Sequence, residues 1–176
     1  MIMMRNRLLW AGAAVAILAG VYFFVSRVEP EKENMTAAVP PMVSLRNELP
    51  RLSVALGDRT SVPLNELSGD VVLIFFNPEC DHCHQQAEKI AAEKSAFDGW
   101  QVYFIASTEP SAAEEFGVKY KLTDPNFHFG SASVSEVFEA VGQLNEVPTI
   151  LIYKNRMFIG RFDGVTPLEE LKKKLI

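Results

Sequence analysis

The chain has 176 residues, of which 48% are apolar and 22% charged, with a formal net charge of −5. This length and composition suit one packed domain with an appended segment. The first 25 residues contain two arginines and no acid, so 15 basic and 22 acidic residues follow them. Because the domain is acidic, it has no electrostatic reason to bind nucleic acid, and we expect no such partner.

The amino-terminal segment predicts a membrane anchor. Arg5 and Arg7 precede Leu8 to Val25, an uncharged and largely apolar stretch of 18 residues. As a helix it would be about 27 Å long, close to the hydrocarbon thickness of a bilayer. A cleaved signal peptide is the alternative, but Val21 to Val25 is bulky where small residues would be needed. The arginines favour residues 1–7 in the cytoplasm and a domain that faces outward.

A linker is predicted between the anchor and the domain. Residues 26–48 mix Pro30, Pro40 and Pro41 with charged and small residues and show no sustained period. We therefore expect a folded domain over residues 49–176.

The domain begins with a predicted hairpin, a strand and a helix. The arms of the hairpin are Leu52 to Leu56 and Arg59 to Leu64. Val71 to Phe76 is continuously apolar, which is typical of a central strand buried on both faces. From Cys80 apolar residues recur at helical spacing to an expected end near Phe97. The apolar face of this helix comprises Cys83, Ala87, Ile90 and Ala91, and the polar side comprises His84, Glu88 and Lys89.

The middle of the domain predicts a strand and a helix. Gln101 to Ala106 is the strand, and Ser111 with Glu114 predicts a capping box for a short helix that reaches about Tyr120. We expect Asp124 to Ser131 to form a loop.

In the last part of the domain the sequence predicts a helix, a hairpin and a final helix. Ser133 with Glu136 predicts a capping box. The apolar stripe of that helix comprises Val134, Val137, Phe138 and Val141. Thr149 to Tyr153 and Met157 to Phe162 predict the hairpin, and Thr166 is the expected cap of the final helix. This order predicts an α/β fold with a mixed sheet and helices on both faces.

The chain has two cysteines, and both lie in the segment Cys80-Asp81-His82-Cys83. Two thiols in the first turn of a helix can close a disulfide locally, and the free N–H groups of that turn stabilise a thiolate. A C-x-x-C segment beside a strand–helix–strand pattern is typical of a redox motif. The pair therefore predicts a reversible dithiol–disulfide couple.

Three other interpretations of these residues stay open. A zinc site would use both cysteines with His82, His84 or His128, but a second Cys or His pair is missing. Residues 80–84 also satisfy C-x-x-C-H, the attachment motif of c-type haem, for which Met157 or another Met could be an axial ligand. A purely structural disulfide would close a short loop and constrain the unfolded chain little.

The segment from Phe75 to Cys83, together with Val147-Pro148-Thr149, resembles the thioredoxin superfamily, and the resemblance covers residues 49–176. The leading hairpin and the predicted anchor are similar to extracytoplasmic thioredoxin-like proteins that resemble peroxiredoxins and serve cytochrome c maturation. The resemblance implies that Cys80 is the exposed nucleophile and Cys83 the buried resolving thiol. It also implies a cis bond between Val147 and Pro148 that faces the disulfide and binds an extended substrate.

Two positions depart from the family. Thioredoxins carry a buried acid where this chain has Ile74, and many anchored relatives place Glu where this chain has Gln86. The usual group that takes a proton from the resolving thiol is therefore missing. Water, His82 or His84 is expected to take it instead.

The neighbours of Cys80 set the direction of electron flow. His82, when protonated, favours the thiolate and an oxidising couple, whereas Glu79 and Asp81 oppose the thiolate and favour a reductant. Two fixed charges against one partial charge favour the reductant.

The sequence thus predicts a single-pass protein of the inner (cytoplasmic) membrane whose outward-facing thiol-disulfide oxidoreductase domain reduces disulfides of secreted or periplasmic proteins, such as apocytochrome c. A membrane thiol-electron donor would supply its electrons, and no cofactor or metal is expected. The alternatives are a disulfide-forming oxidase, a copper metallochaperone using Cys80, Cys83 and a histidine, and a c-type cytochrome. Glu79 and Asp81 argue against a thiol peroxidase.

Overall fold

The computed structural model describes residues 48–176, so the predicted anchor and residues 26–47 of the predicted linker lie outside the described residues. Within residues 48–176 no helix is long and apolar enough to cross a membrane. The strands are β1 (Ser53–Leu56), β2 (Ser61–Pro63), β3 (Asp70–Phe76), β4 (Trp100–Ala106), β5 (Phe127–Ser131), β6 (Thr149–Lys154) and β7 (Met157–Asp163). The helices are α2 (Asp81–Ala92), α3 (Pro110–Lys119), α4 (Val134–Val141) and α5 (Leu168–Leu175), with short 3-10 helices at Leu64–Glu66 and Lys94–Phe97.

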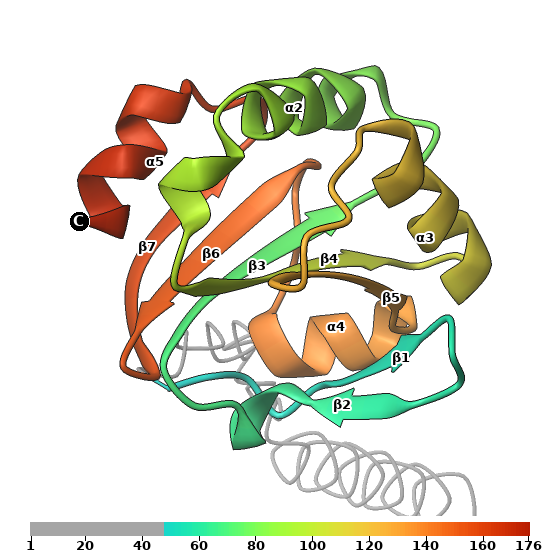
Figure 1. Cartoon of the computed structure of the whole chain (residues 1–176). Helices are drawn as coiled ribbons and strands as arrows, with labels where there is room; N and C mark the ends of the chain where they lie inside the picture. Colours follow the sequence, from blue (N-terminus) through green and yellow to red (C-terminus); the bar gives the residue numbers. More distant parts are fainter. Residues whose placement is uncertain (1–47) are drawn as a thin grey trace, which may run out of the picture. The chain divides into compact units, whose positions relative to one another are not determined.

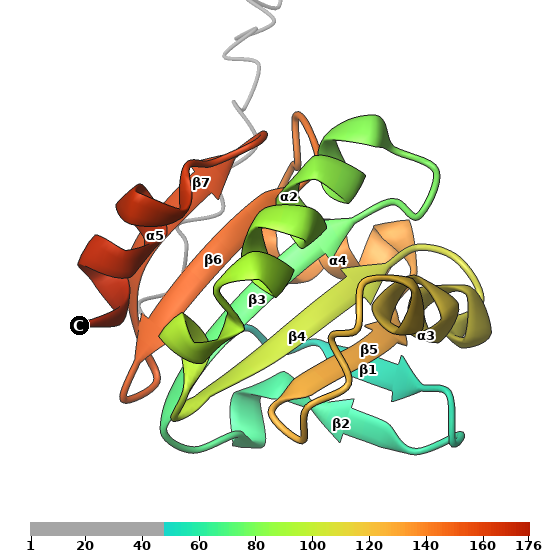
Figure 2. The same cartoon turned by 45° about the horizontal axis from the view of Figure 1, so that its top comes forward.

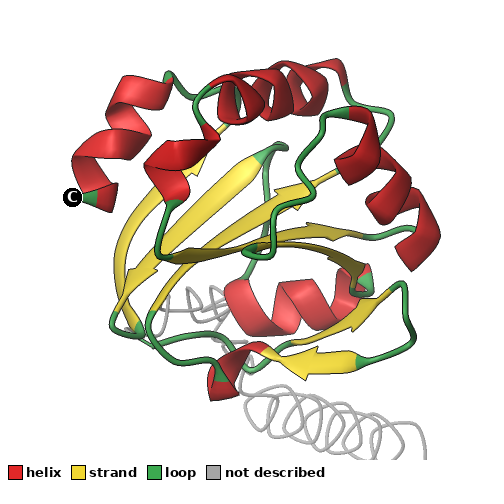
Figure 3. Ribbon diagram, in the orientation of Figure 1, coloured by secondary structure: helices red, strands yellow, loops and turns green. Residues whose placement is uncertain are grey.

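The strands form one mixed sheet in the order β2-β1-β5-β4-β3-β6-β7 (Figure 1). Strands β3, β4 and β5 are parallel neighbours, whereas β6 pairs with β3, β7 with β6, and β1 with β5 and β2 in the antiparallel sense. Figure 3 shows the sheet between its helical layers. The predicted mixed sheet with helices on both faces is confirmed.

Helices α2, α3 and α5 cover one face of the sheet, and α4 covers the other (Figures 1 and 2). Strand β3 contributes to both layers, because its side chains alternate between faces. Val72, Ile74 and Phe76 lie in the cluster with α2, while Val71, Leu73 and Phe75 lie in the cluster with α4. The prediction of a strand buried on both faces is confirmed. The end of β3 packs against α2, the helix that carries Cys83.

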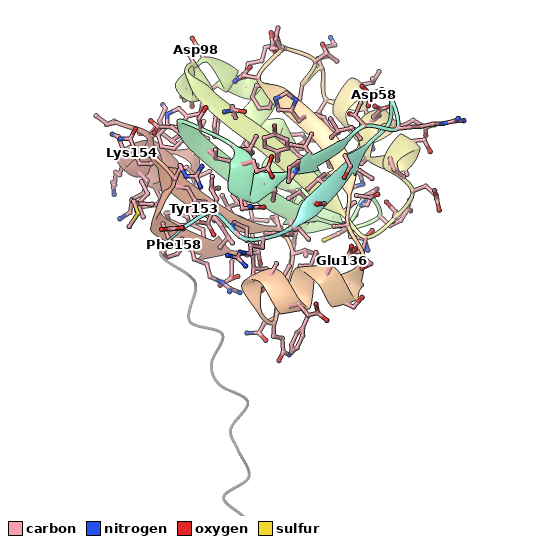
Figure 4. The ribbon with its side chains drawn as sticks, turned by 90° about the horizontal axis from the view of Figure 1, so that it is seen from below. Asp58, Asp98, Glu136, Tyr153, Lys154 and Phe158 are labelled. Atoms are coloured by element: carbon pink, nitrogen blue, oxygen red, sulfur yellow. The ribbon has the colours of Figure 1, made fainter. Side chains whose placement is uncertain are left out.

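The two predicted hairpins are confirmed. Strands β1 and β2 pair through Val54 and Val62, and β6 pairs with β7 from Thr149 to Lys154. In the second hairpin the rings of Tyr153 and Phe158 meet at 5.6 Å in an edge-to-face arrangement and lie close together in Figure 4. This contact anchors one edge of the sheet.

The expected loop from Asp124 to Ser131 is wrong, since its second half is strand β5. Phe127 and Phe129 pack into the cluster with α2 and α3, and the side chain of His128 between them stacks on Tyr103 of β4. This alternation is the signature of a strand, but it spans few residues and runs into Gly130. Pairing with β4 on one side and β1 on the other stabilises it.

Three predicted helix ends are also wrong. Helix α2, which was expected to reach Phe97, ends at Ala92, and a separate 3-10 turn then places Phe97 in the core. Helix α3 begins at Pro110, before the expected Ser111 cap, and its cap residue makes no side-chain hydrogen bond. A proline in the first turn suits a helix start because its missing N–H has no partner there anyway. Helix α5 likewise begins at Leu168, and the Thr166 hydroxyl donates to the Gly164 carbonyl at 3.2 Å instead of capping it.

The capping box of α4 is confirmed. The Ser133 hydroxyl accepts from the Glu136 N–H at 3.3 Å, and the Glu136 carboxylate accepts from the Ser133 N–H at 2.9 Å. The predicted apolar stripe of this helix is only half buried, because Val134 and Phe138 are 71% and 52% exposed.

Candidate active site

The two cysteines lie at the junction between β3 and α2. After the buried Phe76, the Asn77 side chain accepts from the Glu79 N–H at 2.9 Å, and the Asn77 carbonyl accepts from the Cys80 N–H at 3.0 Å. This turn puts Cys80 at the cap position of α2, in an extended backbone conformation. The helix then carries Cys83 into the core one turn later.

Cys83 is buried, with 2% of its surface exposed, and its sulfur accepts a hydrogen bond from the Asn77 N–H at 3.5 Å. Burial raises the pKa of the Cys83 thiol to about 12, and the Asn77 N–H offsets only part of this effect. The free Cys83 side chain is therefore a thiol at neutral pH.

Cys80 is half-buried and lies against the segment that precedes β6. Its thiol donates to the Val147 carbonyl at 3.6 Å, and the bond between Val147 and Pro148 is cis, as predicted. The Pro148 carbonyl in turn accepts from the Gly164 N–H at 2.8 Å, which joins this segment to the loop after β7. The fold thus brings together Cys80, Cys83 and the Val147–Pro148 segment, whose roles the sequence predicts.

The predicted tuning residues are all at the surface. Glu79, Asp81 and His82 are exposed, so solvent and salt screen their effect on the Cys80 sulfur.

His84 is not the solvated polar residue that the helical pattern predicts. Its ring is half-buried, stacks on Phe116 of α3 with centroids 5.2 Å apart, and its Nδ1 pairs with the Tyr120 hydroxyl at 2.6 Å. Because Tyr120 is 36 residues away, no local sequence signal indicates the contact. The pair fixes α3 against the start of α2.

A hollow of about 370 Å³ opens beside the cysteine turn. Pro78, Glu79 and His84 line it from the cysteine side, and Glu115, Phe116 and Lys119 line it from α3.

Both departures from the thioredoxin pattern lie in the interior. Ile74 is buried in β3. Gln86 is buried on α2, and its Oε1 accepts from the Thr166 N–H at 2.7 Å. The sequence pattern of α2 does not single out Gln86 as buried, and its partner lies 80 residues downstream.

The residues of the alternative zinc interpretation are not assembled. His128 lies on β5, two strands from β3 in the sheet, and stacks on Tyr103 with centroids 4.5 Å apart. In the described part of the chain no group of three or more His, Cys, Asp or Glu side chains is placed to hold a metal ion.

Comparison with known families and structures is consistent with this geometry. The sequence model of the AhpC/TSA family matches residues 45–162, about two thirds of the chain. The chain belongs to the AhpC/TSA family. Membership in this family confirms the predicted placement in the thioredoxin superfamily, and it confirms a thiol-disulfide oxidoreductase at the level of the family. No curated protein sequence matches the chain significantly.

Solved structures similar to this AhpC/TSA-family chain share its fold. A secreted disulfide oxidoreductase of Mycobacterium tuberculosis, homologous to E. coli DsbE, is 17% identical with a TM-score of 0.58, over 71% of this chain and 94% of that one. StoA from Bacillus subtilis is 16% identical with a TM-score of 0.53, over 69% and 92%. A peroxiredoxin-like protein from Aquifex aeolicus is 15% identical with a TM-score of 0.59, over 73% and 84%.

Proposed function

We propose that the chain is a membrane-anchored thiol-disulfide oxidoreductase that faces the periplasm or cell exterior and reduces disulfides of secreted proteins, such as apocytochrome c. The observation that carries the proposal is that Cys80 is accessible at the start of α2 while Cys83, in the first turn of the same helix, is buried. The carbonyl of Val147 lies 3.6 Å from the Cys80 sulfur. A nucleophile, a resolving thiol and a backbone edge for substrate are therefore present in one place.

The reaction follows from this arrangement. The Cys80 thiolate attacks one sulfur of a substrate disulfide, and the other substrate sulfur leaves as a thiolate. An extended substrate segment pairs with the backbone at Val147, which holds the mixed disulfide against the start of α2. Cys83 then loses its proton and attacks Cys80, so the substrate is released reduced and a Cys80–Cys83 disulfide remains. Two electrons pass from the protein to the substrate, and a membrane thiol-electron donor restores the dithiol.

The proposed location has separate support. Leu8 to Val25 has the length and composition of an anchor, and a secreted oxidoreductase stands among the similar structures. Disulfides persist outside the cytoplasm, where a reductant of this kind has substrates. An anchor also keeps the domain near a membrane protein that supplies electrons.

Trapping of the mixed disulfide between Cys80 and its substrate tests the mechanism. Cys83→Ser removes the resolving thiol, so the Cys80 mixed disulfide with the natural partner should accumulate in membranes and separate on a non-reducing gel. The double variant Cys80→Ser, Cys83→Ser is the control and should trap nothing. If Cys83→Ser accumulates no covalent partner, the mechanism is wrong.

The reduction potential of the pair tests the direction. We expect a value near that of thioredoxin, about −270 mV, for a reductant. The exposed carboxylates of Glu79 and Asp81 next to Cys80 favour this value, because they oppose the thiolate that an oxidant must stabilise. A value near about −120 mV would instead indicate an enzyme that installs disulfides.

A further inference from the structure

Gln86 carries an unpaired buried donor. Its side chain is 1% exposed, and its Oε1 accepts from the Thr166 N–H at 2.7 Å. Because an N–H group needs an acceptor, this hydrogen bond fixes which end of the amide is oxygen. The other end, Nε2, is buried without a partner, the one such side-chain nitrogen or oxygen in residues 48–176. A buried donor without a partner is unfavourable and calls for an explanation.

The position of Gln86 supplies that explanation. It follows Cys83 by three residues on α2, so the two side chains are neighbours on one helix face. Both are buried, and the apolar cluster around Cys83 includes Ile74 and Phe76 of β3 and Ile150 of β6, which offer no side-chain donor. The Cys83 sulfur has one hydrogen bond, from the Asn77 N–H at 3.5 Å. A thiolate at this place would have only this long hydrogen bond unless Gln86 supplied a second donor.

We propose that Gln86 is a positioning residue whose free Nε2–H group donates to the Cys83 thiolate while Cys83 attacks the mixed disulfide. The inference rests on the proposed function. In this step the Cys83 thiol gives its proton to water and its sulfur forms a bond to the Cys80 sulfur. The bond between Cys80 and the substrate sulfur breaks, and the substrate leaves as a thiolate that takes up a proton. The donor gains its partner only in the charged state, so it favours the reactive state over the resting thiol.

The surroundings hold Gln86 in place beside Cys83. Thr166, which binds Oε1, lies in the loop whose Gly164 N–H donates to the Pro148 carbonyl at 2.8 Å. The amide is thus tied to the same loop that supports the Val147–Pro148 segment. Cys80 raises the pKa of the Cys83 thiol further, and the charged or titratable side chains at the start of α2, Glu79, Asp81 and His82, are exposed. Gln86 itself stays neutral at every pH.

The test removes the donor without adding a base. Gln86→Met keeps the length of the side chain but has no N–H donor and no carboxyl group that could take the Cys83 proton, as the Glu of the anchored relatives would. The matched control is Gln85→Met, the same change on the exposed neighbour in the same helix. A mixed disulfide is formed on each reduced protein with a disulfide-containing peptide, and its resolution is followed by rapid acid quench from about pH 6 to pH 9. At about pH 7 we expect Gln86→Met to resolve it about tenfold or more slowly than Gln85→Met, with the pH profile of resolution displaced upward.

Equal resolution rates and pH profiles in the two variants would overturn the inference. If Gln86→Met does not fold, the wild-type protein decides by NMR. As the pH is raised toward about 11, the carbon signal of the Gln86 side-chain amide should move together with the Cys83 Cβ signal. Movement of the Cys83 signal alone would overturn the inference. If the wild-type protein forms no mixed disulfide with any peptide, the proposed function fails as well, whereas normal turnover with unaffected Gln86→Met defeats the role of Gln86 alone.

Discussion

Cys80 and Cys83 are chemically identical, and their placement at the start of α2 separates their proposed roles. Cys80 is half-buried at the helix cap, whereas Cys83 is one turn into the core, and burial raises the pKa of the Cys83 thiol to about 12. An alkylating agent needs both access and a thiolate. The two residues should therefore react at very different rates.

In the reduced protein at about pH 8, iodoacetamide is expected to modify Cys80 at least about tenfold faster than Cys83, because Cys83 is inaccessible and protonated. Tandem mass spectrometry of the peptide that contains both residues measures the ratio. In denaturant the two thiols should react at similar rates. Comparable rates in the folded protein would contradict the assigned roles.

The same pKa shift predicts how stability depends on pH. The pKa of Cys83 is raised from 9.0 to about 12 in the folded protein, so folding favours the protonated thiol. This contribution is fully present below about pH 9 and is lost as the pH rises toward about 12, by at most about 1.4 kcal/mol per pH unit. Reduced wild-type protein should lose stability above about pH 9 more steeply than Cys83→Ala, in urea unfolding under strong reductant. Burial also raises the pKa of Tyr153 to about 12, but this effect is common to both proteins.

Among the elements, those with long and regular patterns could be predicted from the sequence. Strand β3 is an unbroken apolar run, and the capping box of α4 is a local signature, so each was found in its place. Strand β5 was missed because its alternation spans five residues and its stability comes from pairing with β4 and β1. The start of α5 differs from the prediction because the Thr166 hydroxyl donates to the Gly164 carbonyl instead of capping the helix.

Pairing between β5 and β1 depends on a close backbone approach at Gly130. A Cβ atom there would lie 2.5 Å from the Ala55 carbonyl oxygen and 2.7 Å from the Val54 side chain. The backbone of β1 cannot move without loss of pairing, so we expect Gly130→Ala to destabilise the protein by about 1–3 kcal/mol in urea unfolding. The control is Gly160→Ala in β7, where the nearest atom would be at 3.5 Å, an ordinary contact. Equal stability of the two variants would contradict this prediction.

At the scale of the whole molecule, the sequence predicts the centre of the site but not its support. Cys80, Cys83 and Pro148 could be named because a C-x-x-C segment after a buried strand and a later Val-Pro pair are recognisable patterns. The contacts of His84 with Tyr120 and of Gln86 with Thr166 could not, because they join residues 36 and 80 positions apart. These pairs depend on how α2, α3 and the loop before α5 pack together, and the sequence alone does not specify that packing.

The boundary of the domain depends on packing on the other face of the sheet. Leu49 and Leu52 are buried in the cluster beneath β3, and the Leu49 N–H donates to the Arg156 carbonyl at 3.2 Å. A fragment that begins at Ser53 loses both leucines, and each loss leaves a cavity in the core. We expect this fragment to be less stable in urea than one that begins at Met42 by about 4 kcal/mol or more, from the typical loss of about 2–5 kcal/mol per buried leucine. Double substitution of both leucines by alanine in the longer fragment should give a similar loss. If the two fragments unfold at the same urea concentration, the segment before β1 is not part of the folded domain.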